Sequence, residues 1–302
     1  GVVGTVWMGL TGDFTLWLIL RALNGVFSAW VLVLVSSYYV SRLAGIGRPE
    51  FQGWVFSGVG AGIAIAGLAC LVFMVGGTGS ALSWQITGFA SLGVIAIVCL
   101  SIGAEVPSDR PLPQDRTAHR SPPDWGIVAA YGAMGAGYII PATYLPVMAR
   151  EIVPDPLIFG WSWPVFGAAA FVSTIYAATL QKRYTNRQVW AVCQAIMAAG
   201  LILPVLYPHI ATIIAAGLCV GGTFMIITMT GMKEAHRIAP PDEVMRHIAI
   251  MTASFAAGQV IGPVFASTVY DVTQSFALPL VIASAVLVVT ILPLLRPGRA
   301  HA

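Results

Sequence analysis

Long uninterrupted apolar stretches constrain this chain more than any other feature of its sequence. Nine of them run for about 20 residues or more, the length that an α-helix needs to cross a bilayer core of about 30 Å. They are far longer than the ~10-residue alternating strands of a membrane β-barrel. Only 9% of the residues are charged and 58% are hydrophobic, which is outside the range of soluble domains. The sequence therefore predicts an all-α integral membrane protein, with spans near 14–42, 51–76, 82–103, 125–149, 157–180, 187–207, 209–232, 247–270 and 275–295.

One polar stretch divides these spans into two groups. Residues 104–124 read AEVPSDRPLPQDRTAHRSPPD and hold seven charged residues and five of the 19 prolines. Proline and charge together exclude a buried helix, so we expect a solvated linker. It separates a partial N-terminal transmembrane bundle, 1–103, from a six-helix C-terminal bundle, 125–302. Three full spans and one half-span (1–11) come before the linker, and six come after it. If the halves are repeats, the chain is N-terminally truncated and lacks two and a half helices.

The basic residues predict the orientation. Numbering the loops alternately places 13 Lys and Arg residues on one side and only Arg150 on the other, while Arg21 lies inside a span. Short loops rich in Lys and Arg stay on the cytoplasmic side of the membrane. We therefore expect the linker and the C-terminus to be cytoplasmic.

Glycine motifs occupy equivalent places in the two halves. Gly58 and Gly62, and likewise Gly258 and Gly262, form GxxxG in the second-to-last span of their half, and GxxxG lets helices approach closely. Chance is the alternative explanation, because the chain has 32 glycines. The agreement in position favours an internal repeat and a role in helix packing or gating.

Several motifs resemble the major facilitator superfamily (MFS) of secondary transporters. The stretch LRALNG (20–25), with Arg21, Asn24 and Gly25, is similar to the Arg-x-x-Gln/Asn-Gly pattern of the fourth helix in that family. The stretches SGVGAGIAIAG (57–67) and GQVIGP (258–263, ending at Pro263) are similar to the glycine motifs of its fifth and eleventh helices. GAGYIIPATYLPVMAR (135–150) resembles the bacterial YbfB/YjiJ-type branch. The resemblance implies an MFS-type two-bundle fold, here about helix 3 to helix 12.

The chain also departs from the family pattern. The loop between helices eight and nine often carries a Gly-x-x-x-Asp-Arg motif in MFS proteins, whereas this chain has LQKRYTNR (180–187), which is basic but contains no Asp. The copy of the motif between helices two and three would precede Gly1. We therefore expect one gating motif to be absent and the other degenerate.

Arg21 is the strongest candidate for a functional side chain. It lies about seven residues into its span, roughly 10 Å deep. A charge in hydrocarbon is costly and usually faces a cavity or a partner. We predict contact with a substrate anion or a role in proton coupling, with Asn24 beside it; a structural contact or snorkelling is the alternative. All 12 acidic residues fall in loops or at span edges, so a titratable partner would lie on absent helices, or the balancing charge would come from an anionic substrate.

Polar residues in the predicted span 125–149, which corresponds to helix seven of the MFS pattern, are the next candidates. Tyr131 and Tyr138 share one helical face, and Pro141 and Pro146 would kink the helix. We predict a cavity wall formed with Thr143, Tyr144 and, in helix eleven, Gln259; packing tyrosines are the alternative. Trp161 and Trp163 are expected in an aromatic belt. We expect His209, His236 and His247 to be solvated loop residues.

The sequence thus predicts a secondary active transporter of a small solute in the bacterial cytoplasmic (inner) membrane, a symporter or antiporter. An anionic solute and proton coupling are options within this prediction. No enzyme motif is evident, and we expect no cofactor, no metal and no nucleic-acid partner. We expect the protein to be a monomer in a lipid bilayer. Two alternatives stay open. One is a non-transporting membrane sensor or scaffold of the same fold, and the other is a fragment without activity.

Overall fold

The computed structural model describes residues 1–102, 121–180, 183–240 and 242–296. Of the predicted linker, only residues 121–124 are among them. The regular elements of the described residues are helical, which confirms the all-α prediction. They are α1 (Val2–Met8), α2 (Phe14–Gly45), η1 (Pro49–Phe51), α3 (Gln52–Val75), α4 (Ser80–Ile102), α5 (Trp125–Ile152), α6 (Pro156–Phe159), α7 (Ser162–Leu180), α8 (Asn186–Leu206), α9 (Ile210–Ile238), α10 (Val244–Thr273), α11 (Ala277–Val289) and η2 (Leu292–Leu295).

Nine helices in the described part of the chain are long and apolar enough to cross a membrane. Most of their bounds agree with the predicted spans to within about three residues. The exceptions are α7, which begins at Ser162 after the short α6, α11, which ends at Val289 before η2, and α9, which was predicted to end at 232 and continues to Ile238. The difference at α9 matters for function, because the added residues include Glu234.

Contacts between Cα atoms divide the chain into two compact units. The first comprises Gly1–Val35 and Ala69–His119, and the second comprises Ser36–Leu68 and Arg120–Ala302. Helices α2 and α3 each contribute residues to both units. The division into two sequence halves around the linker stays a prediction, and each unit is described below by itself.

The first unit is built on the packing of α1 against α4. Two glycines allow this approach, since a Cβ on Gly9 would lie 2.8 Å from Gln85 Cγ and one on Gly88 would lie 2.9 Å from the backbone nitrogen of Val6. Gln85 also donates from Nε2 to the Gly9 carbonyl at 2.8 Å. A polar side chain therefore ties the C-terminal end of α1 to α4 in a largely apolar surrounding.

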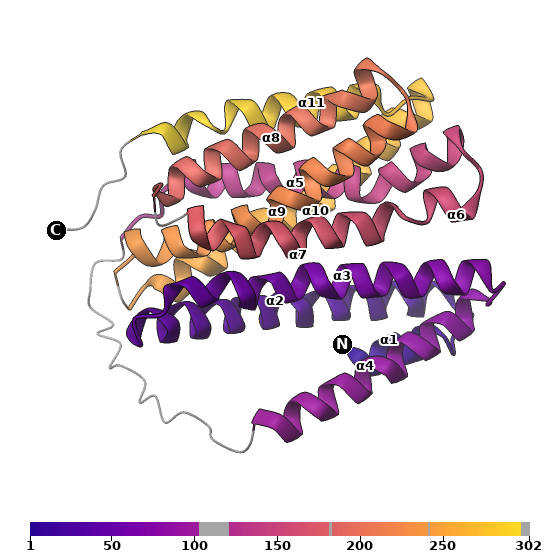
Figure 1. Cartoon of the computed structure of the whole chain (residues 1–302), viewed down its shortest axis with the longest axis horizontal. Helices are drawn as coiled ribbons and strands as arrows, with labels where there is room; N and C mark the ends of the chain where they lie inside the picture. The colour runs from indigo at the N-terminus through magenta and orange to yellow at the C-terminus, as the bar shows by residue number, and fades with distance from the viewer. Residues whose placement is uncertain (103–120, 181–182, 241, 297–302) are drawn as a thin grey trace. The chain divides into compact units, whose positions relative to one another are not determined.

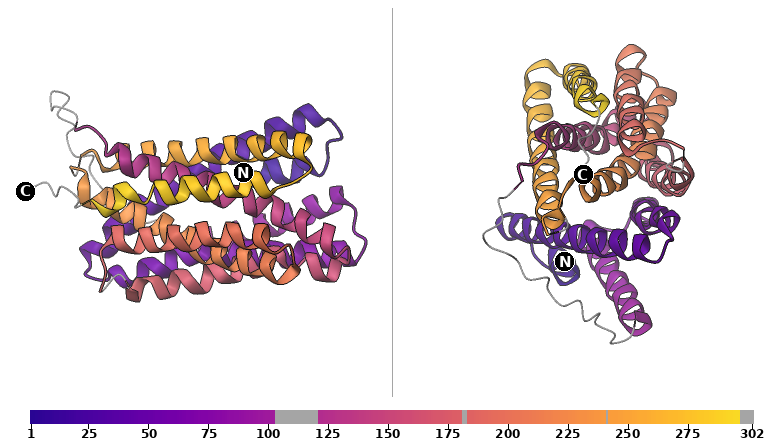
Figure 2. Two further views of the ribbon diagram at one scale, coloured as in Figure 1. Left: turned by 90° about the horizontal axis from the view of Figure 1, so that it is seen from above. Right: turned by 90° about the vertical axis from the view of Figure 1, so that its left-hand side faces the viewer.

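In the second unit, α5 is the central helix. It contacts α7, α8, α9, α10 and α11 (Figures 1 and 2). The core of this unit is made of large apolar side chains with 0–1% exposure, namely Met134, Trp190, Met197, Leu201, Ile227, Met229, Met232, Ile248, Leu280 and Leu287. The N-terminus of α5 is fixed by Asp124, whose carboxylate accepts hydrogen bonds from the backbone of Gly126 and Ile127.

Glycine governs the contact between α10 and α5. A Cβ on Gly258 would lie 2.8 Å from the Ala136 nitrogen and closer still to the Gly132 carbonyl oxygen. A Cβ on Gly262 would lie 3.0 Å from Ile139 Cγ2. The two glycines of this GxxxG therefore form the tight helix contact that such spacing permits.

The corresponding motif in α3 is oriented differently. A Cβ on Gly58 or Gly62 would meet no heavy atom within 4 Å of the described chain. The close approach of α3 to α7 is made by Gly60, against the backbone of Ala170 and Phe171, and by Gly67, against Pro164. On α7 the matching residue is Gly167, whose Cβ would lie 2.7 Å from Ala64 Cα. The packing glycines of α3 are thus Gly60 and Gly67, rather than the predicted pair.

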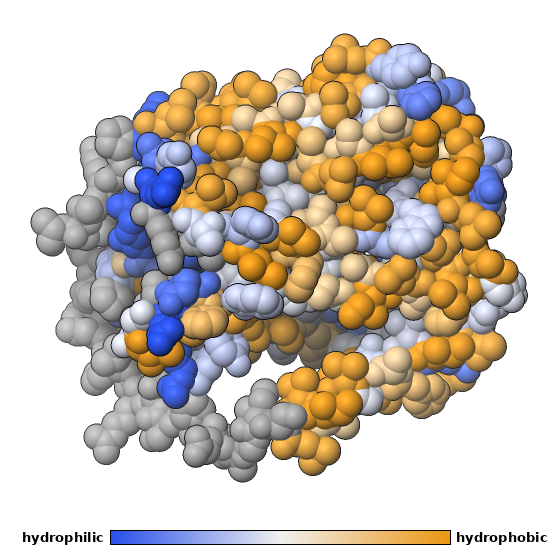
Figure 3. Space-filling model, viewed as in Figure 1, coloured by the Kyte–Doolittle hydropathy of each residue, from blue (hydrophilic) through white to orange (hydrophobic). Residues whose placement is uncertain are grey.

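The outward faces of the second unit's helices carry large exposed apolar side chains, among them Val192, Val260 and Val264, each at least 60% exposed. Figure 3 shows such hydrophobic cover over much of the viewed surface, with hydrophilic residues gathered at one end of the helices. Hydrogen bonds connect the polar residues at this end in the second unit. We call it the basic end and define it by residues 121–125, 183–188, 233–237, 242–247 and 296.

Candidate functional site

Tyr131 of α5 lies in the core of the second unit. It is 1% exposed. Its ring packs edge-on against Trp190 of α8, with centroids 5.7 Å apart, and at a tilt of 39° against Phe255 of α10, with centroids 5.5 Å apart. The ring also lies 3.1 Å from the position of a Cβ on Gly231 of α9. These contacts are those of a packing side chain that fixes α5 against three neighbours.

Tyr138, two turns further along α5, belongs to a cluster of aromatic rings. It stacks on Phe224 of α9 with a centroid distance of 4.7 Å and an interplanar angle of 10°. Phe255 of α10 and Phe166 of α7 each lie 6.1 Å away. We call Tyr138, Phe166, Phe224 and Phe255 the aromatic cluster. Tyr138 is half-buried, and its hydroxyl makes no hydrogen bond to another described residue.

Tyr144 and Pro263 form a polar contact between α5 and α10. The Tyr144 hydroxyl donates to the Pro263 carbonyl at 3.0 Å. Its ring packs on Phe276, with centroids 4.6 Å apart. The neighbouring Thr143 is exposed and Gln259 is half-buried. The structure therefore connects Tyr144 with Pro263, and it shows Thr143 on a different face of α5.

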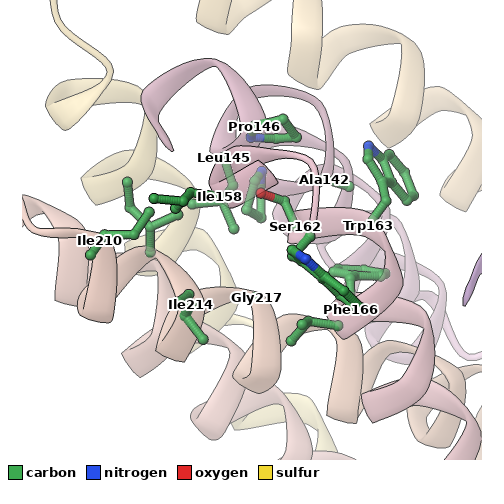
Figure 4. Close-up of a pocket in the computed structure, with 14 residues that line it drawn as sticks. Ala142, Leu145, Pro146, Ile158, Ser162, Trp163, Phe166, Ile210, Ile214 and Gly217 are labelled. Atoms are coloured by element: carbon green, nitrogen blue, oxygen red, sulfur yellow. The ribbon is translucent and has the colours of Figure 1, made fainter. Parts of the chain in front are cut away.

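Beside the aromatic cluster lies a small apolar pocket with a volume of about 60 Å³. It is formed by the second half of α5, α6, the start of α7 and the start of α9, and Figure 4 shows the side chains that surround it. Phe166 belongs to both the pocket and the aromatic cluster. The other lining residues are Pro141, Ala142, Leu145, Pro146, Ile158, Trp161, Ser162, Trp163, Val165, Ile210, Ile213, Ile214 and Gly217. Trp161 and Trp163, predicted as belt residues, are thus part of the pocket wall.

A proline in α5 leaves the backbone carbonyl of one pocket residue without its helical donor. Pro146 has no N–H, so it cannot donate to the carbonyl of Ala142, four residues earlier. Ala142 itself lines the pocket. A helix can leave a carbonyl free in this way only where it borders a cavity or finds another partner. The hydroxyl of Ser162 already donates to the Phe159 carbonyl at 2.6 Å, so it stabilises the start of α7.

In the first unit, Arg21 lies between two indole rings. Its guanidinium carbon is 5.5 Å from the Trp17 ring centroid and 5.8 Å from that of Trp84 in α4. The two tryptophans are themselves in edge-to-face contact at 6.2 Å. Such cation–π contacts are strongest away from water. One turn further on, Asn24 approaches Met8 Sδ at 3.9 Å, and a Cβ on Gly25 would meet no described atom within 4 Å.

A buried ionic network, which was not predicted from the sequence, lies at the basic end of the second unit. Arg187 donates from Nε to the Glu234 carboxylate at 2.6 Å and from Nη2 to Asp124 at 2.9 Å. Arg237 bonds the same Glu234 at 2.6 Å. The expectation that no span holds a buried carboxylate is therefore wrong, since the side chain of Glu234 is 1% exposed within α9. It failed because the predicted span ended at residue 232, two residues before Glu234, whereas α9 continues to Ile238.

The network also reinterprets the degenerate loop motif. Arg187 is the last residue of LQKRYTNR, which contains no acid. The structure supplies the acid from elsewhere, with Asp124 at the start of α5 and Glu234 near the end of α9. The only local signal was the Glu234–Arg237 spacing of three residues, which places both side chains on one helical face.

A second polar group at the basic end holds residue 121, just before α5. The Glu243 carboxylate accepts from the Ser121 hydroxyl at 2.5 Å and from its backbone nitrogen at 3.2 Å, and Arg246 lies 3.4 Å away. The hydrogen bonds from Ser121 and the charge of Arg246 lower the pKa of Glu243. His247, expected in a solvated loop, is 5% exposed and contacts the Glu243 carbonyl through Nδ1 at 3.1 Å.

Comparison with known proteins identifies the fold. A family model described as "Uncharacterised MFS-type transporter YbfB" matches residues 2–295. The chain belongs to this family. Among curated proteins, none matches it. The sequence-based resemblance to the MFS and to its YbfB-type branch is confirmed, and so is the all-α membrane fold.

Membership makes the chain a multi-pass membrane transporter of the MFS type that handles a small-molecule solute. In this YbfB-type transporter, the described residues form three candidate functional sites. They are the apolar pocket with its aromatic cluster, the indole-flanked Arg21, and the ionic network at the basic end.

Proposed function

We propose that this YbfB-type protein is a secondary active transporter, a symporter or antiporter that carries a small solute by alternating access. The observation that carries the proposal is the apolar pocket at the half of α5 that contains Pro141 and Pro146, bordered by the aromatic cluster. Substrate sites of secondary transporters lie where helices are interrupted, because only a cavity tolerates irregular backbone within a membrane.

The chemistry of the pocket favours a small solute with an apolar part. Two tryptophans and Phe166 supply aromatic faces, and none of the described residues that line the pocket is charged. The carbonyl of Ala142, which Pro146 leaves without its helical donor, supports one hydrogen bond to an N–H or O–H of the solute. The hydroxyl of Tyr138, which has no hydrogen-bond partner among the described residues, supports a second polar contact through the aromatic cluster.

Arg21 is proposed as the fixed positive charge of the transport cycle, with Asn24 next to it. Two indoles hold its guanidinium, and the depth of this charge in its span supports a role beyond packing. Arginine does not titrate in the physiological range, so it acts on a solute anion or on the proton affinity of a nearby acid. Measuring flux with and without a proton gradient, in wild type and in Arg21→Gln, distinguishes these roles.

The orientation and location of the protein are proposed from its charge distribution. Thirteen of the 15 Lys and Arg residues fall in loops on one side of the predicted topology. The positive-inside rule then places the basic end, the linker and the C-terminus in the cytoplasm, and the protein in a bacterial cytoplasmic membrane.

Two glycines of α9 provide a matched test of the pocket. A Cβ on Gly217 or on Gly222 would meet no described atom within 4 Å, but only Gly217 lines the pocket. Gly217→Leu therefore fills the pocket without a backbone collision, and Gly222→Leu is its control. Cells that express wild type, either variant or no transporter are compared by untargeted mass spectrometry of cell extracts and medium.

We expect at least one small molecule to redistribute with wild type and with Gly222→Leu, but not with Gly217→Leu. That molecule is then tested for flux in proteoliposomes. The proposal fails if Gly217→Leu, at equal membrane abundance, moves the same molecules as wild type. Saturable binding in proteoliposomes without flux would instead indicate a sensor or scaffold.

A further inference from the structure

A second cavity lies at the basic end of the second unit, away from the apolar pocket. It has a volume of about 620 Å³ and is lined by Tyr184, Thr185, Asn186, Arg187, Gln188, Glu234, Arg237, Leu294, Leu295 and Arg296. We propose that this cavity binds the phosphate-bearing headgroup of an anionic membrane lipid. The proposal does not depend on the solute pocket.

The position of the cavity along the helices corresponds to the depth of lipid headgroups. Its lining residues come from the first turn of the span Asn186–Leu206, the last turns of the span Ile210–Ile238 and the end of the span Ala277–Leu295. Three membrane-spanning helices therefore reach the bilayer surface around it. Basic pockets between helices at this depth are suited to anionic headgroups.

The charge of the cavity favours an anion. Among the described residues, three guanidinium groups line it, those of Arg187, Arg237 and Arg296, together with one carboxylate, that of Glu234. Arg187 is held by Glu234 and by Asp124, which lies outside the lining. The side chain of Arg237 remains 40% exposed although it bonds Glu234, and Arg296 is exposed. Arg237 and Arg296 are therefore the residues that reach a phosphate, while Arg187 supplies fixed charge behind them.

Arg187 also positions the segment that carries Arg296. Its Nη1 donates to the carbonyl of Arg296 at 3.2 Å and to that of Pro293 at 3.5 Å. These bonds join the residue after η2 to the start of α8. Arg296 is thus connected to the ionic network at the basic end through its backbone carbonyl.

Apolar side chains beside the arginines favour a lipid over a free phosphate compound. Leu295 is 65% exposed and Tyr184 is 55% exposed, and both line the cavity. Such residues offer a surface to an acyl chain or glycerol backbone, while the arginines hold the phosphate. A soluble phosphate ester would use the charges but leave the apolar residues uncovered.

The test measures lipid binding to the purified full chain by native mass spectrometry. The probes are phosphatidylglycerol, phosphatidylcholine and soluble glycerol 3-phosphate. The variants are Arg296→Gln and Arg237→Gln, with Arg48→Gln as control, because Arg48 is an exposed arginine (62% for its side chain) outside the cavity. Since Arg237 also bonds Glu234, Arg296→Gln keeps the test interpretable if Arg237→Gln unfolds.

We expect phosphatidylglycerol to bind in preference to phosphatidylcholine, and Arg296→Gln to weaken its binding about fivefold while Arg48→Gln leaves it unchanged. Arg237→Gln should weaken it by a similar factor. Equal binding of the two lipids, or an equal loss in Arg48→Gln and Arg296→Gln, would overturn the site. Binding of glycerol 3-phosphate as tight as that of phosphatidylglycerol would overturn the lipid as its ligand.

Discussion

Arg187 and Glu234 form a 2.6 Å ion pair that joins the first turn of α8 to the last turns of α9. Both side chains are buried, with 9% and 1% exposure. The pair is extended by Asp124 at the start of α5 and by Arg237 on α9. One buried carboxylate therefore connects the polar ends of three helices in the second unit.

Removing the Glu234 charge should destabilise the protein strongly. Breaking a buried ion pair leaves an uncompensated charge and lowers the free energy of unfolding by about 3 kcal/mol. The loss is smaller here because Asp124 still compensates part of the charge of Arg187. We expect Glu234→Gln to lower the thermal unfolding midpoint in detergent. The control is Glu50→Gln, whose partner Arg48 is exposed and 3.9 Å away, and it should change stability by less than about 1 kcal/mol. Equal midpoints for the two variants would contradict the network.

Glycines of α3 should respond differently to alanine according to the face they occupy. A Cβ on Gly60 collides with the backbone of α7, so Gly60→Ala should cost roughly 1–3 kcal/mol through overpacking. A Cβ on Gly58 meets no described atom within 4 Å, so Gly58→Ala should be neutral or stabilising by up to about 1 kcal/mol. Thermal unfolding of both variants in one detergent measures the difference. A larger loss in Gly58→Ala than in Gly60→Ala would contradict the described packing.

The two tyrosine hydroxyls of α5 should separate stability from transport. Tyr144→Phe removes a hydrogen bond to the Pro263 carbonyl and should lower stability by about 1 kcal/mol. Tyr138→Phe removes a hydroxyl without a described partner, so stability should stay within about 0.5 kcal/mol of wild type while flux of the solute falls. Denaturation and proteoliposome flux are measured on both. Unchanged flux in Tyr138→Phe would exclude its hydroxyl from solute contact.

Acid should weaken the anchoring of residue 121 through Glu243. The pKa of this carboxyl is lowered from its ordinary value of 4.5, chiefly by the hydrogen bond from the Ser121 hydroxyl. A depressed carboxyl pKa contributes stability that is present above the ordinary value and lost as the pH falls through the lower, folded value. Thermal midpoints measured from pH 6 to about pH 3 should therefore fall more steeply for wild type than for Glu243→Gln. Parallel slopes would show that Glu243 is not responsible.

Much of the fold was predictable because hydropathy and length depend on local sequence alone. Nine spans follow from this signal. The end of α9 was misplaced, since charged residues such as Glu234 lower hydropathy even where the helix continues. Two other predicted spans each correspond to a pair of elements, α6 with α7 and α11 with η2. Helix faces were harder to predict. The GxxxG spacing of Gly58 and Gly62 marks small residues but does not say which face meets a neighbour, and the structure uses Gly60 and Gly67.

The candidate site was predictable only in part, for a different physical reason. The helix α5, its two prolines and Tyr138 were predicted from the sequence, and they border the pocket or its aromatic cluster. Tyr131 lies on the same helical face as Tyr138, but it is buried between Trp190 and Phe255. This burial depends on how helices distant in the sequence pack, which the local sequence does not show. The ionic network joins Arg187 to Asp124 and Glu234, which lie 63 and 47 residues away, so no local pattern could reveal it.

Alternating access can be measured by spin-label distances in lipid nanodiscs, after the native cysteines Cys70, Cys99, Cys193 and Cys219 are replaced. One label pair, at Gly12 and Pro208, lies in the loops predicted to be external, and the other, at Leu100 and Tyr184, lies near those predicted to be cytoplasmic. If the transporter alternates between two states, each pair should show two distances, and the fraction of molecules with the long distance in one pair should match the fraction with the short distance in the other. A single distance in both pairs, unchanged by a proton gradient or by the solute, would contradict alternating access.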